Sequence, residues 1–228
     1  MARYLFHGVS MQNKRPSNMD SLLLKSGRLG PEDALLAVVC DGVGSLRDGA
    51  MSSGLAVSML DEWFMRMVDA EWAGLRLRDA ILAINAHIVG LARANAIDTA
   101  TTLSALLLVE DDYYIAHIGD SRIYCLGAEG LSVLTDDDTT ESGALSAYIG
   151  KDEDIFMQYC EGSACGKTFL LCSDGLYKRM DMVLLAQSMH LRNRRSLKEA
   201  VQLLPEYVIG QGEQDNITLA ILKTKKKG

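Results

Sequence analysis

Three apolar runs in the middle of the chain are joined by links too short for a parallel connection, and this feature constrains the fold most. The runs cover residues 103–109, 113–118 and 122–126. Asp111-Asp112 predicts a hairpin turn between the first two, and Gly119-Asp120-Ser121 predicts a second turn. Because a parallel return needs a crossover of about a dozen residues, these strands must run antiparallel. Further strand-like runs cover residues 35–40, 168–172 and 217–222.

Three other stretches have the period of an amphipathic helix, with apolar side chains every three or four residues. Each forms one stripe that a helix packs on a core, so we assign these side chains no cofactor role. Ser196 is the expected N-cap of the third helix. The order of strands and helices predicts an α+β fold of antiparallel sheets covered by helices. The stripes consist of Ala56, Leu60, Trp63, Phe64 and Met67; of Leu77, Ile81, Ile84, Ile88 and Leu91; and of Leu197, Val201, Leu204 and Val208.

The composition is that of a globular chain without a nucleic-acid partner. Hydrophobic residues make up 48% and charged residues 23% of the 228, which argues against global disorder. The net charge is −7, whereas a nucleic-acid binder usually carries the opposite sign. Only three prolines occur and no linker divides the chain. We therefore expect a single domain over residues 1–228, with a short basic C-terminal tail at about 223–228.

Several features indicate a cytoplasmic protein without membrane contact. The first residues lack the apolar stretch of a signal peptide, and no apolar run approaches the ~18 residues of a membrane helix. Five cysteines without a Cys-x-x-Cys pair fit reduced thiols better than disulfides or a zinc site. Alternation along their strands is expected to turn Cys40 and Cys172 toward the core.

Aspartates stand next to the ends of five strand-like runs. Asp41, Asp120 and Asp174 each follow one run, while Asp20 and Asp215 stand just before one. Any one of them alone is most simply a turn residue. If the strands belong to one pair of packed sheets, the five carboxylates can converge, and they then need a cation to balance their charge. Oxygen-only ligands select hard ions such as Mg²⁺ or Mn²⁺, and no histidine accompanies them to indicate zinc.

Six short motifs, in order along residues 3–223, together resemble the metal-dependent serine/threonine protein phosphatases of type 2C. Each motif alone is weak, and the match lies in their order. The bacterial single-domain members are most similar in length and in lacking a histidine after Asp41-Gly42. The resemblance implies an antiparallel β-sandwich flanked by helices on both sides, in four layers α-β-β-α. The motifs are RPSNMDS at 15–21, VCDGVG at 39–44, ATTL at 100–103, HIGDSR at 117–122, LCSDGL at 171–176 and DNIT at 215–218.

The resemblance also implies a centre of two Mn²⁺ or Mg²⁺ ions with a possible third. Position by position, Asp41 is expected to bridge both ions, and the Gly42 carbonyl to bind one of them. Asp174 and Asp215 are expected to hold the other ion. Asp120 matches the aspartate that binds a third, weaker ion in bacterial members.

Asp20 and Arg15 complete the implied site. Asp20 is expected to steady metal-bound water, and Arg15 to clamp the substrate phosphate with two parallel donors. Two cations about 3.5–4 Å apart neutralise a phosphate and lower the pKa of a bridging water, which then attacks as hydroxide. Asp41 and Arg15 are thus the expected catalytic residues, and no covalent phosphoenzyme is needed.

Three positions depart from the family pattern. Met19 stands where glutamate or glutamine is usual, and a thioether is a poor ligand for a hard cation. Val43 stands where eukaryotic members have a histidine proposed as general acid, so water is expected to protonate the leaving group. Asp138 stands where a histidine is common, with no effect that the sequence reveals. Residues 141–150 are expected to include the flap, a loop beside the active site.

The leading hypothesis is a Mn²⁺- or Mg²⁺-dependent phosphatase acting on phosphoserine and phosphothreonine in proteins. Its expected partners are phosphorylated proteins, among them a serine/threonine kinase and its targets, and the expected state is a monomer. A regulatory pseudophosphatase, a binding module with the same fold, is the alternative, and Met19 favours it. A hydrolase of small phosphate esters is a third reading, because it would share the same metal centre.

Overall fold

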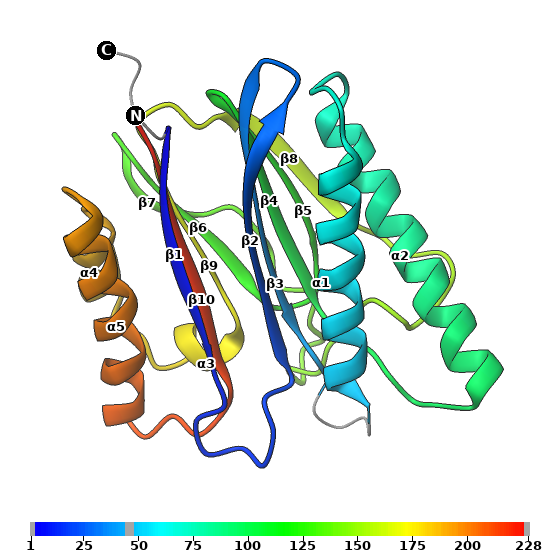
Figure 1. Ribbon diagram of the computed structural model, residues 1–228. Coiled ribbons are helices and arrows are strands. Elements are labelled where there is room, and N and C mark those ends of the chain that lie inside the picture. Colours follow the sequence, from blue (N-terminus) through cyan, green and yellow to red (C-terminus); the bar gives the residue numbers. More distant parts are fainter. Residues whose placement is uncertain (1–2, 44–47, 226–228) are drawn as a thin grey trace.

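The computed structural model describes residues 3–43 and 48–225, which form two five-stranded antiparallel sheets packed face to face (Figure 1). The first sheet has, in spatial order, β1 (Tyr4–Met11), β10 (Ile217–Thr224), β9 (Thr168–Cys172), β6 (Arg122–Gly127) and β7 (Gly130–Val133). The second has β2 (Asp20–Leu29), β3 (Glu32–Asp41), β4 (Leu103–Val109), β5 (Asp112–Ile118) and β8 (Gln158–Ser163).

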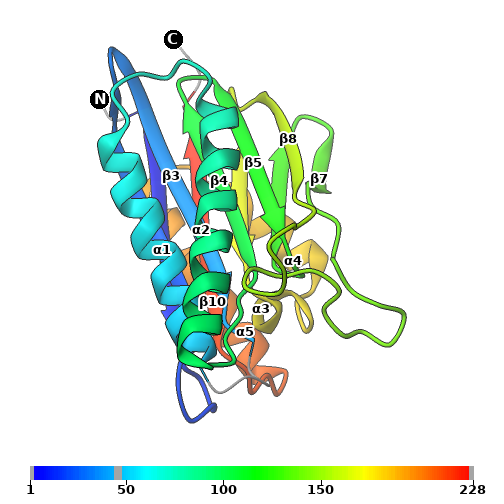
Figure 2. The same ribbon diagram turned by 90° about the vertical axis from the view of Figure 1, so that its right-hand side faces the viewer.

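Helices cover the outer face of each sheet, so the predicted four-layer α-β-β-α architecture is confirmed (Figures 1 and 2). The two long helices α1 (Gly49–Arg66) and α2 (Ala73–Asn95) pack on the second sheet. On the first sheet lie α4 (Met182–Met189) and α5 (Arg194–Gly210). The short α3 (Asp174–Tyr177) follows directly on the end of β9.

Strand β3 shows why its sequence is apolar throughout. Val38 and Cys40 pack in the cluster beneath α1 and α2, whereas Ala37 and Val39 pack in the cluster between the sheets. Both faces of the strand are therefore buried, and each buried valine stabilises the fold by roughly 1.5–3 kcal/mol. Cys172 of β9 is likewise buried under α4 and α5, which confirms the expected inward direction of both cysteines.

The helical stripes are also confirmed, but the N-cap of α5 is Asn193 rather than Ser196. The Asn193 side chain accepts hydrogen bonds from the backbone of Arg195 and Ser196, at 2.9 and 3.0 Å. Ser196 returns a hydrogen bond by accepting from the Asn193 backbone N–H at 3.0 Å. The two residues form a reciprocal capping box, in which Asn193 is the N-cap and Ser196 is the third residue of the helix.

Edge strands account for most of what the sequence patterns do not predict. Strands β1, β7 and β8 each lie at an edge of a sheet, where half-exposed side chains leave no continuous apolar run. The β4–β5 hairpin is confirmed, but its turn is Glu110-Asp111, because Asp112 already pairs with Val109. Of the predicted tail, Lys223 belongs to β10 and pairs with Leu5, and residues 226–228 lie outside the described residues. No helix among the described residues is long and apolar enough to cross a membrane.

Candidate active site

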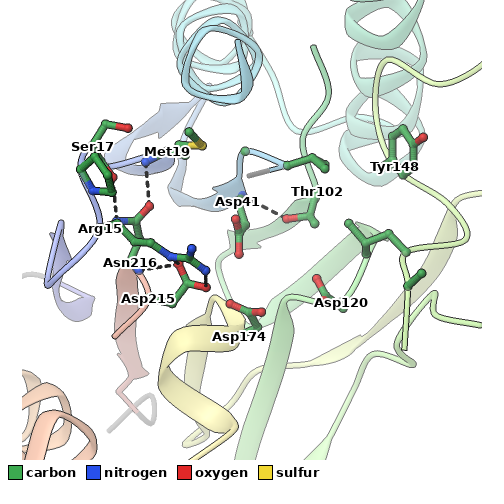
Figure 3. Close-up of a pocket in the computed structure, with 15 residues that line it drawn as sticks. Arg15, Ser17, Met19, Asp41, Thr102, Asp120, Tyr148, Asp174, Asp215 and Asn216 are labelled. Atoms are coloured by element: carbon green, nitrogen blue, oxygen red, sulfur yellow. Dashed lines mark hydrogen bonds and ion pairs between the residues drawn. The ribbon is translucent and has the colours of Figure 1, made fainter. Parts of the chain in front are cut away.

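Four of the five predicted aspartates line one pocket (Figure 3), at or near the ends of strands from both sheets. Asp41 ends β3, and Asp20 starts β2 directly opposite it in the strand register. Asp174 starts α3, immediately after β9 of the other sheet. Asp120 lies in the β5–β6 turn, and Asp215 lies just before β10. A pocket of about 770 Å³ opens here and is lined by Arg15, Asp41, Gly42, Asp120, Asp174 and Asp215.

The backbone around Asp41 is fixed by the neighbouring threonines, which leaves its carboxylate facing the pocket (Figure 3). The Asp41 N–H donates to Thr102 Oγ1 at 3.0 Å, and the Thr102 N–H donates to the Asp41 carbonyl at 2.8 Å. Gly42 follows in close contact with α1, since a Cβ on it would lie 2.4 Å from the Gly49 carbonyl oxygen. Only glycine fits there, so the Asp-Gly pair is a requirement of packing as well as of any turn.

Asp20 lies behind Asp41 and is almost fully buried. The Ser173 hydroxyl donates to its Oδ2 at 2.8 Å, but Oδ1 is buried without a hydrogen-bond partner among the described residues. Burial raises the pKa of Asp20 to about 6. A buried carboxylate oxygen without a donor requires a partner that the polypeptide does not supply. Metal-bound water is such a partner, so this oxygen fits the role that the resemblance implies for Asp20.

The clustered carboxylates oppose one another's ionisation. Burial, followed by the charges of the other site aspartates, raises the pKa of Asp41 well above its usual value. Burial and the charge of Asp174 raise the pKa of Asp120 to about 6. A cation would reverse these shifts, and oxygen donors of this kind suit Mn²⁺ or Mg²⁺. The donor set therefore fits a centre of hard divalent ions.

Two of these carboxylates are paired with cations of the chain itself. Arg15 donates through Nε and Nη2 to the two oxygens of Asp215, at 2.7 and 2.6 Å. Burial raises the pKa of Asp215, but the hydrogen bonds from Arg15 outweigh it and leave that pKa below its usual value. Lys178, which lies outside the six sequence motifs, donates to Asp174 Oδ2. Within the described residues, no three acidic, histidine or cysteine side chains are already arranged to hold a metal ion.

Asn216 holds the loop that carries Arg15. Its side-chain oxygen accepts from the Met19 N–H at 2.9 Å, and its amide nitrogen donates to the carbonyls of Gln12 and Ser17 at 2.8 and 3.0 Å. The loop between β1 and β2 is thus fastened to the start of β10 about 200 residues away. The sequence signal that could have pointed to this role is the position of Asn216, directly after Asp215 and directly before the buried strand β10.

Known proteins are similar to this chain over most of its length. The family model described as protein phosphatase 2C matches residues 8–211. This chain belongs to the protein phosphatase 2C family. It is 29% identical over 213 residues to the serine/threonine phosphatase stp of Listeria welshimeri, covering 82% of this chain and 84% of that one.

Solved structures of serine/threonine phosphatases share the fold. The serine/threonine phosphatase Stp1 from Staphylococcus aureus superposes with a TM-score of 0.85 at 20% identity, over 100% of this chain and 96% of that one. The catalytic domain of the phosphatase PstP, in complex with two manganese ions, gives 0.84 at 22% identity, over 98% and 99%. The α+β class and the family resemblance are therefore confirmed.

The three departures from the type 2C pattern occupy different surroundings. Met19 and Val43 both line the pocket. The Met19 carbonyl accepts from the Gly42 N–H at 3.1 Å, so its backbone also supports the site. Asp138 instead accepts a hydrogen bond from the Gly119 N–H, next to Asp120. The predicted flap does border the pocket, through Ala144, Leu145 and Tyr148.

Proposed function

We propose that this protein 2C phosphatase hydrolyses phosphoserine and phosphothreonine in proteins, at a centre of two Mn²⁺ or Mg²⁺ ions. Phosphoprotein phosphatase activity follows from its family. The observation that carries the proposal is the meeting of four carboxylates at one pocket, with the buried Asp20 paired opposite Asp41 and one of its oxygens lacking a donor. A regulatory binding module would have no need to keep such mutually repelling groups together.

Different residues of the chain would hold the ions and orient the water at this centre. Asp41, the Gly42 carbonyl, Asp174 and Asp215 would hold the two ions, which supply a hydroxide nucleophile and neutralise the phosphate. Asp20 would accept a hydrogen bond from water at the centre through its free Oδ1. These groups thereby orient the water that attacks phosphorus.

Arg15 can bind the substrate phosphate without leaving Asp215. A guanidinium has five N–H donors, and the Asp215 pair uses Nε and Nη2. The Nη1 donors remain for a phosphoryl oxygen on the open side of the pocket. Asp215 would then orient Arg15 for in-line transfer, and Val43 offers no proton to the leaving serine or threonine, so water would supply it.

Several finer assignments belong to the same proposal. Asp120, whose carboxylate faces the pocket beside Asp174 (Figure 3), would hold a third ion. We propose that the enzyme acts as a single-domain monomer on targets of a serine/threonine kinase. The five unpaired thiols support a reducing, cytoplasmic setting.

The decisive experiment measures hydrolysis of a phosphopeptide panel and of p-nitrophenyl phosphate with Mn²⁺, with Mg²⁺ and with EDTA. We expect turnover that depends on metal and a loss of at least ~10²-fold in Asp41→Asn, because the metals supply both nucleophile and electrophile. Asp79→Asn, which removes an exposed carboxylate of α2, is the matched control.

Each contrary result has a definite meaning. No metal-dependent turnover of any substrate by the wild-type protein would favour the binding module. Turnover of p-nitrophenyl phosphate without any phosphopeptide would favour a hydrolase of small esters. Activity of Asp41→Asn within a few-fold of wild type would remove Asp41 from the site.

A further inference from the structure

Asp138 makes a reciprocal pair of hydrogen bonds with the residue that precedes Asp120. The Asp138 backbone N–H donates to the Gly119 carbonyl at 2.8 Å, and the Gly119 N–H donates to Asp138 Oδ2 at 2.8 Å. Gly119 has a φ of +114°, and a Cβ on it would lie 2.6 Å from Thr102. The turn thus has one backbone conformation available, and Asp138 satisfies both of its polar groups.

The same residue also contacts the flap and the edge of the second sheet. The Ser146 N–H, within the flap, donates to the Asp138 carbonyl at 2.8 Å. Gln158 of β8 donates to Asp138 Oδ1 at 3.1 Å. Close by in sequence, Leu145 and Tyr148 of the flap line the pocket. One residue therefore joins three segments that all approach the site.

An aspartate suits this position better than the histidine common in the family. A carboxylate has two acceptor oxygens, and here they take the N–H groups of Gly119 and Gln158. A neutral imidazole has only one acceptor nitrogen and could satisfy only one of the two. The Asp138 side chain is half-buried, which strengthens hydrogen bonds to its charge relative to those on an exposed carboxylate.

We propose that Asp138 is a positioning residue that couples the flap to Asp120. Its side-chain hydrogen bonds to Gly119 and Gln158 fix the Asp138 backbone. That backbone in turn holds the turn before Asp120 through its N–H and the flap through the Ser146 N–H that its carbonyl accepts. Binding of the ion at Asp120 and order of the flap then depend on one another. This inference rests on the proposed function, because it assigns Asp120 to an ion.

The test compares Asp138→Ala and Asp138→Asn with the control Asp136→Ala. Asp136 is exposed, carries the same charge and lies two residues away, so the control reports the loss of charge alone. Calorimetry with Mn²⁺ gives the affinity of the weakest ion, and the rate of chymotrypsin cleavage after Tyr148 gives the order of the flap. Both readouts are independent of turnover.

In Asp138→Ala we expect the weakest Mn²⁺ ion to bind about 10-fold less tightly, the range seen when groups that orient metal ligands are removed. Flap cleavage should accelerate by a similar factor, while the tighter ions bind within two-fold of wild type. Asp138→Asn keeps one acceptor oxygen and should fall between Asp138→Ala and wild type. KM for a phosphopeptide should rise more than KM for p-nitrophenyl phosphate, because the larger peptide would contact more of the flap.

Other outcomes overturn the inference. If Asp138→Ala and Asp136→Ala agree within two-fold in both readouts, Asp138 has no positioning role. If only one readout changes, the flap and Asp120 are not coupled. If Asp138→Ala does not fold, Asp138→Asn decides by the same criteria. If the wild-type protein binds no Mn²⁺ at all, the proposed function fails instead, so the two failures are distinct.

Discussion

At the scale of single residues, the site carries its own counterions. Arg15 and Lys178 each pair with an aspartate expected to bind metal. Burial lowers the pKa of Lys178, but its hydrogen bond with Asp174 outweighs this and leaves the pKa above the usual lysine value. These cations reduce the repulsion among the carboxylates, and a divalent ion at Asp174 would compete with Lys178.

Removing the Lys178 charge should therefore strengthen metal binding. In Lys178→Met we expect Mn²⁺ to bind about two- to five-fold more tightly, since a half-exposed ion pair contributes roughly 0.2–1 kcal/mol. Lys178→Arg keeps the charge and should match the wild type. Calorimetric titration of both variants with Mn²⁺ measures the effect, and unchanged or weaker binding in Lys178→Met would show that the lysine does not compete.

At the scale of elements, the active site depends on close contacts between segments that sequence patterns treat separately. Strand β9 ends in Cys172 and α3 begins at Asp174, so the chain changes direction within two residues. Gly175 then passes against the start of β10, where a Cβ on it would lie 2.0 Å from the Asn216 carbonyl oxygen. This contact holds α3 beside the segment that carries Asp215.

Alanine at Gly175 should push these two elements apart. We expect Gly175→Ala to lower the free energy of unfolding by roughly 1–3 kcal/mol, as overpacking does, and to weaken Mn²⁺ binding because Asp174 moves relative to Asp215. Urea denaturation and calorimetry are the measurements.

A second glycine provides the control. Gly90 is exposed in the interior of α2, and a Cβ there would meet no described atom within 4 Å. Gly90→Ala should therefore stabilise the protein by about 0.5–1 kcal/mol, with Mn²⁺ binding unchanged. Equal stability of the two alanine variants would contradict the close contact at Gly175.

At the scale of the whole molecule, the metal-free protein carries a concentrated negative site within a chain of net charge −7. The pKa values of Asp20 and Asp120 are raised to about 6 from a usual value of 3.8, chiefly by burial. The pKa of Asp41 is raised well above that value by the same cause. The folded state thus binds more protons than the unfolded state between about pH 4 and 6.

The metal-free protein should therefore be more stable at pH 5.5 than at pH 7.5. A raised carboxyl pKa contributes stability that is complete below the unfolded pKa and lost as pH rises through the folded one. His117 opposes this, because burial lowers its pKa and acid then favours the unfolded state. Three carboxyl groups outweigh one imidazole, so we expect Tm in EDTA to rise by at least about 3 °C on acidification, which corresponds to roughly 1 kcal/mol.

Saturating Mn²⁺ should reverse this trend, because metal binds the deprotonated carboxylates. Asp20→Asn should flatten the pH dependence of the metal-free protein, since it removes one of the three groups. Calorimetric melting scans between pH 5.5 and 7.5 measure both effects. A Tm in EDTA that falls on acidification would show that His117 outweighs the carboxylates.

Features that depend on neighbouring residues in the chain could be predicted from the sequence. Alternation and short links gave the antiparallel buried strands, the apolar stripes gave the helices, and the aspartates stood visibly at strand ends. The polar edge strand β8 could not be predicted from its residues, and neither could the use of Asn193 instead of Ser196 as the N-cap of α5.

The contacts between distant segments could not be predicted in this way, because they depend on how the chain packs in three dimensions. The pairing of β2 with β3 places Asp20 opposite Asp41. The packing of the two sheets brings Asp174 and Asp215, which flank neighbouring strands of the first sheet, to the pocket that Asp41 lines. Arg15 reaches Asp215 across 200 residues, and Asp138 hydrogen-bonds with both Gly119 and Ser146. The periodicity of apolar residues indicates which face of a helix or strand is buried. It does not indicate which other element packs against that face, and these contacts depend on that partner.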